Sequence, residues 1–227
     1  MSNLIHNNGH LMAVVDVETT GLRPRHNDIV QICVLPIDSD FQPLKGVVPF
    51  YAEMRPKRPQ NIDFKGMTVN KLTLDEIMAK APDASKMADL FTEWYKKLPL
   101  PHGKCLMPLA CNWPFDRAFV EDWLGPAHFE YFFHPYYRDL MGAALVQNDI
   151  AAYHLEQYPY PKLSLGYLCN LLGVENQMAH DALGDCMATA ACYRELLRRS
   201  RWTPVVLTEE QAKEIHVEDR TAAPPAA

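Results

Sequence analysis

The chain has 227 residues, of which 48% are hydrophobic and 22% are charged, and its formal net charge is -6. This length suits one domain with a full core or two very small ones, and we expect one domain with tails. The acidic balance argues against broad coating of duplex nucleic acid, which needs a wide basic surface. It is compatible with binding a short end of a nucleic acid beside metal ions, because a metal site is itself acidic.

The cysteines and the hydropathy pattern bear on where the protein works. The six cysteines form no CxxC pair and fall mostly in apolar segments, which is typical of buried free thiols in a reducing cytosol and argues against a zinc site. Residues 1–10 are polar and lack the apolar region of a secretory leader, and no later run is long enough to span a membrane. We expect a cytoplasmic protein that does not interact with membranes.

The first part of the chain predicts a strand meander followed by helices. Runs rich in β-branched residues predict strands over 11–16, 28–36 and 44–51. The connections between them are too short for crossover helices, so these strands should be antiparallel neighbours. A capping box at 73–76 and the helical spacing of apolar residues over 84–98 predict two helices.

Strands and helices then alternate. Strands are expected over 105–111 and 129–133, with a helix between them that Asn112 can cap and whose first turn contains Pro114. Three further helices are expected over 139–153, 163–172 and 181–199. This order predicts an α/β fold, a mixed sheet with helices packed on it.

The predicted domain covers residues 11–202. Residues 1–10 are expected to be an N-terminal tail. Residues 203–227 are polar and then rich in proline and alanine, which predicts a mobile C-terminal tail that could dock a partner.

The run VVDVETTG places two acids on one face of a strand. Asp16 and Glu18 are two residues apart and point the same way, whereas Val15 and Val17 face the opposite side. Two carboxylates at this spacing repel each other unless a cation lies between them, and hard oxygen ligands suit Mg²⁺ or Mn²⁺. Taken alone, the pair would be better explained as a solvated surface alternation.

Two more segments bring acids to the start of helices. NWPFD places Asp116 in the first turn after a strand, and HDALGD places His180 at a helix start with Asp185 about one turn further in. Asp116 alone could simply be favoured by the helix dipole, an effect of about 0.5 kcal/mol. Asp181 is expected to cap its helix, whereas a histidine such as His180 is a poor cap. Together, four acids and one histidine can meet in one cleft.

The segments DVETTG, NWPFD and HDALGD resemble the three motifs of the DEDDh exonucleases, a family of proofreading exonucleases and RNA-trimming enzymes. The resemblance covers roughly residues 11–199, and the motifs have the order and separation of the family. It implies a ribonuclease H-like fold whose five-stranded sheet begins with three antiparallel strands. The chain departs from the family at Cys111-Asn112, where relatives often have His-Asn, and at the unusual insert Trp113-Pro114.

The resemblance also implies roles for individual residues. Asp16, Glu18, Asp116 and Asp185 would hold two divalent cations, Mg²⁺ or Mn²⁺, about 4 Å apart, which clamp the scissile phosphate. His180 would be the general base, because a histidine can accept a proton near neutral pH and its protonation would set the acidic limb of the pH profile. The implied contacts to the terminal nucleotide are Thr19, Thr20, Gly21, Leu22, Met67 and Thr68. We interpret Phe115 as a packing residue.

The expected function is removal of nucleoside 5′-monophosphates from the 3′ end of single-stranded or frayed DNA. Two alternatives stay open. One is an RNA-trimming exoribonuclease, because the sequence does not fix the contacts that read the 2′-hydroxyl. The other is a non-catalytic module that binds a polymerase or another protein through the C-terminal tail, although the intact set of five residues argues against it.

Overall fold

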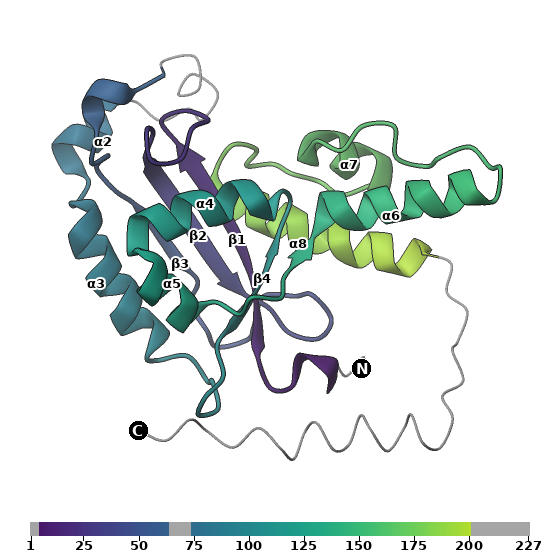
Figure 1. Cartoon of the computed structure of the whole chain (residues 1–227), viewed down its shortest axis with the longest axis horizontal. Coiled ribbons are helices and arrows are strands. Elements are labelled where there is room, and N and C mark those ends of the chain that lie inside the picture. The colour runs from purple at the N-terminus through teal and green to yellow at the C-terminus, as the bar shows by residue number, and fades with distance from the viewer. Residues whose placement is uncertain (1–4, 64–73, 201–227) are drawn as a thin grey trace.

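The structure, a computed structural model, describes residues 5–63 and 74–200. A five-stranded sheet in the order β3-β2-β1-β4-β5 lies at its centre (Figure 1). β1 (Leu11–Thr19) and β3 (Phe50–Glu53) both pair antiparallel with β2 (Ile29–Pro36). β4 (Leu106–Ala110) pairs parallel with β1 and with β5 (Arg138–Asp139). This arrangement confirms the predicted α/β fold of ribonuclease H type, with an antiparallel meander at its start.

Helices cover both faces of the sheet. The α-helices are α2 (Leu74–Lys80), α3 (Ala84–Tyr95), α4 (Trp113–Leu124), α5 (Pro126–Phe132), α6 (Leu140–Tyr153), α7 (Leu165–Leu172) and α8 (Ala182–Arg199), and short 3-10 helices span Ile5–Asn7 and Pro59–Asn61. Helices α3, α4 and α5 pack on one face, and α8 packs on the other with α6 and α7 beside it (Figure 1).

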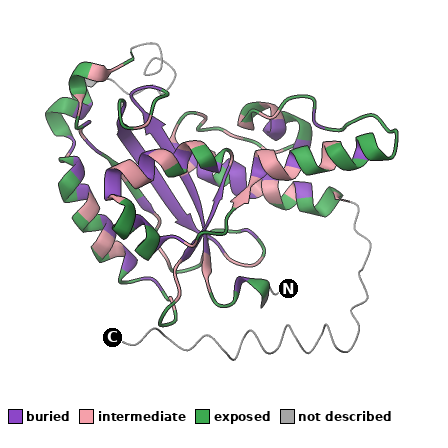
Figure 2. Ribbon diagram, in the orientation of Figure 1, coloured by how far each residue is buried: buried purple, intermediate pink, exposed green. Residues whose placement is uncertain are grey.

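The two faces of β1 bury different residues. The odd-numbered residues of 13–17 pack against α3, α4 and α5, whereas Met12 and Val14 pack against α8. Asp16 and Glu18 continue the even-numbered series, so both belong to the side of the sheet that α8 covers. β1, β2 and β4 are buried over most of their length (Figure 2). The predicted alternation along this strand is therefore confirmed.

The third predicted strand was placed too early in the chain. Residues 44–49 form no strand, and β3 begins at Phe50. The amide of Val47 donates to the carbonyl of Leu44 in a turn, and Gly46 has a φ of 82° there. This turn and Pro49 interrupt the extended conformation that the valines favour.

The prediction of a strand over 129–133 was wrong. Residues 129–132 lie in α5, Phe133 follows the helix and forms only an isolated bridge with Leu106, and the fifth strand is β5 instead. Gly125 and Pro126 begin the helix, the helical spacing of Phe129 and Phe132 places both rings in the core, and the ring of the C-cap residue Phe133 joins them. Aromatic β-propensity was overridden here by packing at a helical period.

Helix ends differ in smaller ways. The helix predicted over 84–98 ends at Tyr95, and the one predicted over 163–172 begins at Leu165. Asn112 occupies the N-cap of α4 without a side-chain cap hydrogen bond. Asp181 caps α8 as predicted, since its carboxylate accepts from the amides of Leu183 and Gly184. Thr73, the first residue of the predicted capping box, lies outside the described residues.

The predicted domain boundaries stay predictions, and residues 203–227 lie outside the described part of the chain. All six cysteines are free; Cys33, Cys169, Cys186 and Cys192 are buried, and Cys105 and Cys111 are partly buried. Within residues 5–63 and 74–200, no helix has both the length and the hydropathy needed to cross a bilayer.

Candidate active site

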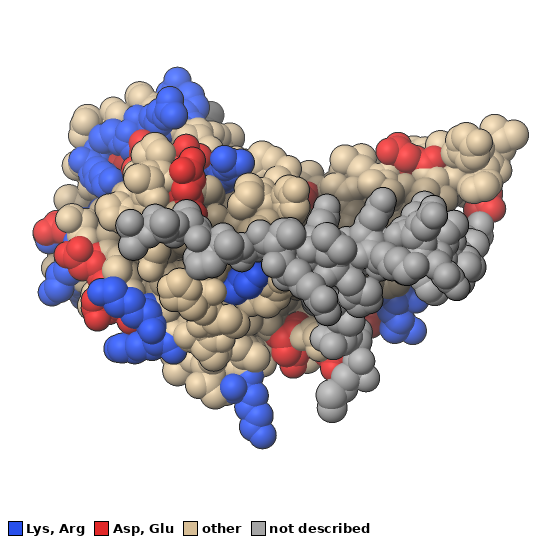
Figure 3. Space-filling model, turned by 60° about the horizontal axis from the view of Figure 1, so that its bottom comes forward, with Lys and Arg blue, Asp and Glu red and all other residues tan. Residues whose placement is uncertain are grey.

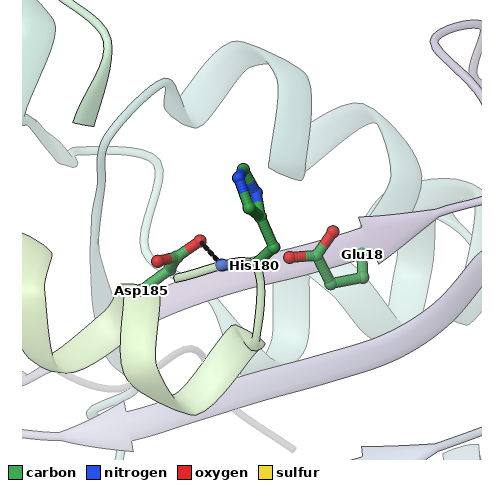
Figure 4. Close-up of side chains that lie close together, drawn as sticks. All are labelled: Glu18, His180 and Asp185. Carbon is green, nitrogen blue, oxygen red and sulfur yellow. Dashed lines mark hydrogen bonds between the residues drawn. The ribbon is translucent and has the colours of Figure 1, made fainter. Parts of the chain in front are cut away.

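Three of the predicted site residues meet at the end of β1. Glu18, His180 and Asp185 each offer one potential ligand atom, and these atoms lie within 4.8 Å of one another (Figure 4). Glu18 comes from β1, where the pairing with β2 shifts register between Glu18 and Thr19. His180 and Asp185 come from the turn before α8 and from its first turn. Such an irregularity in a strand re-aims side chains and is common beside active sites.

The other two acids adjoin this group. Asp116 is buried in the first turn of α4, and its Oδ1 accepts a hydrogen bond of 3.1 Å from the amide of Val17, the residue between Asp16 and Glu18. Burial raises the pKa of Asp16 well above its usual range, and the negative charges of Asp116, Asp185 and Glu18 raise it further. The four acids therefore share one electrostatic environment.

Burial and mutual repulsion make this cluster costly to ionise. Burial raises the pKa of Glu18 to about 7, and the charges of Asp185 and Asp181 add to the effect. The pKa of Asp185 is raised by burial as well, against the opposing effect of its hydrogen bond from Asn176. Converging buried carboxylates are stable either protonated or around a cation, and an all-oxygen donor set suits a hard divalent ion. The four acids fit the implied metal site.

The orientation of the Asp185 carboxylate is fixed by two donors. The side-chain amide of Asn176 donates to Oδ1 at 2.6 Å, and the backbone amide of His180 donates to Oδ2 at 3.3 Å. Asn176 was missed in the sequence because it stands in an irregular segment with no periodic pattern. Hydrogen bonds of this kind orient the carboxylates that bind metals in other proteins.

His180 is presented by a tight turn. Its side chain is exposed, and its φ of 66° lies in the left-handed region, which is uncommon for a residue with a side chain. A Cβ on Gly184 would lie 2.5 Å from the carbonyl oxygen of Met178. The glycine of HDALGD therefore lets the turn before α8 pack directly on the first turn of the helix.

The residues after the first motif differ in exposure. Thr19, Thr20 and Gly21 are buried, and the Thr20 hydroxyl accepts a hydrogen bond of 2.9 Å from the amide of Asp28. The side chain of Leu22 is 76% exposed. Leu22 lines an open hollow of about 700 Å³ together with Arg23, His26, Asn27, Gln60 and others. Met67 and Thr68 lie outside the described residues.

Asn27 organises this loop, and the sequence did not single it out. Its Oδ1 accepts from the amide of Arg23, and its Nδ2 donates to the carbonyls of Thr20 and Asn61 at 3.3 and 2.6 Å. A Cβ on Gly21 would lie 2.6 Å from this side chain. Gly21 thus allows the side chain of Asn27 to lie directly against the loop backbone.

One departure from the family pattern, Trp113, has a structural explanation. Trp113 is buried and packs against Phe129 and Phe133 of the core, and its amide donates to Oδ2 of Asp139 at 2.5 Å. Burial, followed by the charge of Asp139, raises the pKa of the partly buried Cys111 thiol. Trp113, at the start of α4, is therefore a core residue.

The two arginines of the basic segment 55–59 pair with acids. Arg55 pairs with Asp83 at 2.7 Å, and Arg58 pairs with Asp28 at 2.6 Å and with Asp122. On the face drawn in Figure 3, basic and acidic side chains are interspersed.

A family model described as exonuclease (RNase T) matches residues 13–193. The chain belongs to this exonuclease family. The match spans all three motifs, so the predicted membership of the exonuclease family is confirmed. No curated protein matches the sequence.

Solved structures support the fold of this exonuclease family member. The zinc-bound complex of E. coli exonuclease I with single-stranded DNA has a TM-score of 0.66 at 19% identity, covering 84% of this chain and 41% of that one. The nuclease domain of 3′hExo, a DEDDh family member bound to rAMP, has a TM-score of 0.61 at 14% identity, covering 83% and 92%. The cell-death related nuclease 4 (CRN-4) has a TM-score of 0.63 at 14% identity, covering 90% and 76%. The chain thus spans about two fifths of the length of exonuclease I.

Proposed function

We propose that the chain is a metal-dependent 3′–5′ exonuclease that releases nucleoside 5′-monophosphates from single-stranded or frayed DNA. The observation that supports this most directly is the convergence of Glu18, His180 and Asp185 within 4.8 Å. They come from the first and third motifs, and the hydrogen bond between Asp116 and Val17 adds the second. Three segments far apart in the sequence thus contribute to one acidic site.

Asp16, Glu18, Asp116 and Asp185 would hold two divalent cations, Mg²⁺ or Mn²⁺. Glu18 and Asp116 are buried, Asp16 and Asp185 are partly buried, and their carboxylate oxygens form a hard donor set. Their raised pKa values give the ionised acids a strong preference for a positive neighbour. When bound, such ions polarise the phosphate and lower the pKa of a coordinated water.

His180 accepts the proton of the attacking water at a ring nitrogen. The oxygen of that water forms a bond to phosphorus, the bond from phosphorus to the 3′ oxygen breaks, and the leaving oxygen takes a proton from solvent. The exposed position of His180 beside two of the acids suits a group that exchanges protons with water. The hydrogen bond from Asn176 holds the carboxylate of Asp185 in place.

The substrate class is proposed from the loop that follows the first motif. Leu22 is exposed beside the hollow that follows the first motif, where an unstacked terminal nucleotide could lie against it. Exonuclease I was solved with single-stranded DNA and 3′hExo with rAMP, so DNA and RNA are both worth testing. DNA is the proposed substrate, and RNA is the alternative.

The test uses 5′-labelled single-stranded DNA and RNA with Mg²⁺ or Mn²⁺. We expect a ladder of shortened products that EDTA abolishes. Asp16→Ala and His180→Ala should lower the rate at least about 100-fold, the range expected for loss of a general base. Asp149→Ala and His154→Ala, matched changes at exposed positions, should cleave like the wild type.

Two outcomes would contradict the proposal. Unchanged laddering by Asp16→Ala would show that the activity belongs to a contaminant. No laddering on any substrate, with retained binding of the oligonucleotides, would favour the non-catalytic module.

Two expectations that do not concern the site stay predictions: a protein partner and a cytoplasmic location. Contact with a polymerase or another partner through residues 203–227 concerns a segment outside the described residues. The cytoplasmic location is likewise a prediction from the sequence.

A further inference from the structure

A chain of hydrogen bonds joins β2, β3 and the start of α8. Gln31, which is 2% exposed, donates from Nε2 to the hydroxyl of Tyr51 at 3.0 Å. That hydroxyl donates to Oδ2 of Asp181 at 2.5 Å. The amide of Ala182 closes the loop by donating to Oε1 of Gln31 at 2.8 Å. Both polar ends of a buried side chain are thereby satisfied within one small network.

The residues of this network are neighbours of the site residues, either in the strand pairing or along the chain. Gln31 lies directly opposite Glu18 in the pairing of β1 with β2. Asp181 follows His180, and Asp185 lies one turn further along the same helix. The network therefore connects the strand beside Glu18 to the helix end that carries the other two residues.

Helix capping alone does not explain the arrangement. Oδ1 of Asp181 already accepts from the amides of Leu183 and Gly184, which completes the cap. Oδ2 is used for Tyr51, and a buried glutamine spans the remaining distance to the sheet. A buried amide is costly unless both of its ends are paired, and an apolar residue would pack in β2 without that cost. These extra bonds fix where the helix end sits on the sheet.

We propose that Gln31, Tyr51 and Asp181 form a positioning bridge that sets His180 and Asp185 relative to Glu18 for catalysis. This inference rests on the proposed function, since it assigns these residues a role in the same site. None of the three touches the reacting atoms. They act through the placement of α8, and a misplacement of about 1 Å at a reacting group can cost about 100-fold in rate.

Tyr51→Phe is the sharpest variant, because it deletes one hydroxyl and keeps the ring. We expect kcat to fall about tenfold, the equivalent of one hydrogen bond to a charged group, while KM changes less than about twofold. Tyr158→Phe, the same change at an exposed tyrosine of the connection between α6 and α7, should leave both constants unchanged.

Two changes at Asp181 separate the bridge from the cap. Asp181→Asn keeps an oxygen for the helix amides and gains an NH₂ group that can donate to Tyr51, so kcat should stay within about threefold of the wild type. Asp181→Ala removes both interactions and should lower kcat at least about tenfold. Because both residues belong to one network, the double variant Tyr51→Phe/Asp181→Ala should be no slower than Asp181→Ala alone.

Amide hydrogen exchange over residues 182–184 in the metal-free protein measures the bridge without any turnover. Faster exchange in Tyr51→Phe, together with the loss of kcat, supports the proposal. Unchanged kcat, unchanged exchange, or multiplied losses in the double variant would overturn it. If the wild type cleaves no substrate, the proposed function fails on its own, and the exchange rates alone decide whether the bridge exists.

Discussion

At the scale of single residues, the last motif depends on a glycine as much as on its acid and histidine. Gly184 lets the carbonyl of Met178 come within the space that a Cβ would fill. The amide of His180 bonds Asp185 across the same turn. The strained, left-handed conformation of His180 is thus held in place by close packing on one side and by a hydrogen bond on the other.

Gly184→Ala should therefore disturb the site directly. The new methyl group would lie 2.5 Å from a backbone oxygen, so the turn that carries His180 must move. We expect a loss of about 1 to 3 kcal/mol in the free energy of unfolding, typical of overpacking, and a fall in nuclease activity. Urea denaturation and the ladder assay measure the two effects.

Gly166→Ala is the matched control. A Cβ on Gly166 in α7 would meet nothing within 4 Å, and alanine favours a helix over glycine by up to about 1 kcal/mol. This variant should be as stable as the wild type or more so, with full activity. Equal behaviour of the two variants would show that close approach at Gly184 has no consequence.

At the scale of elements, one carboxylate joins two helices beside the site. Oδ2 of Asp139 accepts from the amide of Trp113 at the start of α4, and Oδ1 accepts from the amide of Gly142 in α6 at 2.7 Å. Asn112, the residue at the N-cap of α4, makes no such bond. The first turn of α4, which carries Asp116, is therefore fixed by a residue distant in sequence.

Asp139→Ala should remove both caps at once. At about 1 kcal/mol for each cap, the free energy of unfolding should fall by about 2 kcal/mol, as measured by urea denaturation. Ser164→Ala at the N-cap of α7, where the side chain makes no cap hydrogen bond, should change it by less than about 0.5 kcal/mol. Losses of similar size in the two variants would contradict the double-cap interpretation.

Elements with a strong local pattern were predicted well, and those set by their surroundings were not. β1, β2 and β4 are rich in apolar residues, and Asp181 caps α8 as the sequence indicated. The aromatic spacing of segment 129–133 is compatible with a strand or with a helix. Contact with the ring of Phe91 in α3 favours the helix. β5 has two residues, which is too few for any periodicity.

At the scale of the whole molecule, folding gathers acids that repel one another. Burial and neighbouring charges raise the pKa values of Asp16, Glu18, Asp116 and Asp185. The folded, metal-free chain therefore holds protons that the unfolded chain releases. Where the folded state binds more protons, the free energy of unfolding falls as pH rises.

For Glu18 this loss should develop between the ordinary value of 4.5 and the folded value of about 7. The shift corresponds to about 3 kcal/mol at full ionisation. In EDTA, the melting temperature of the wild type should therefore fall between pH 5 and pH 7.5, relative to that of Glu18→Gln. Added Mn²⁺ should raise the melting temperature more at pH 7.5 than at pH 5, because it binds the ionised acids.

The comparison with Glu18→Gln is needed because other groups titrate as well. Burial lowers the pKa values of His10 and His134, which makes the folded chain less stable as pH falls. Asp149→Asn, at an exposed position, should keep the pH slope of the wild type. A metal-free slope in Glu18→Gln as steep as that of the wild type would contradict this account of the acid cluster.

The sequence by itself determined the family, the sheet type and the five residues of the expected site, because a strand alternation and two helix starts are local patterns. Only the tertiary structure decided how those residues are held. Gln31, Tyr51 and Asp139 contact partners that lie 151, 130 and 26 positions away, and Asn27 contacts Asn61, 34 positions away. Gln31 was visible as a polar residue in an apolar strand, but its partner at Ala182 was not. A hydrogen bond between distant segments exists only once packing has brought them together, so no local pattern records it.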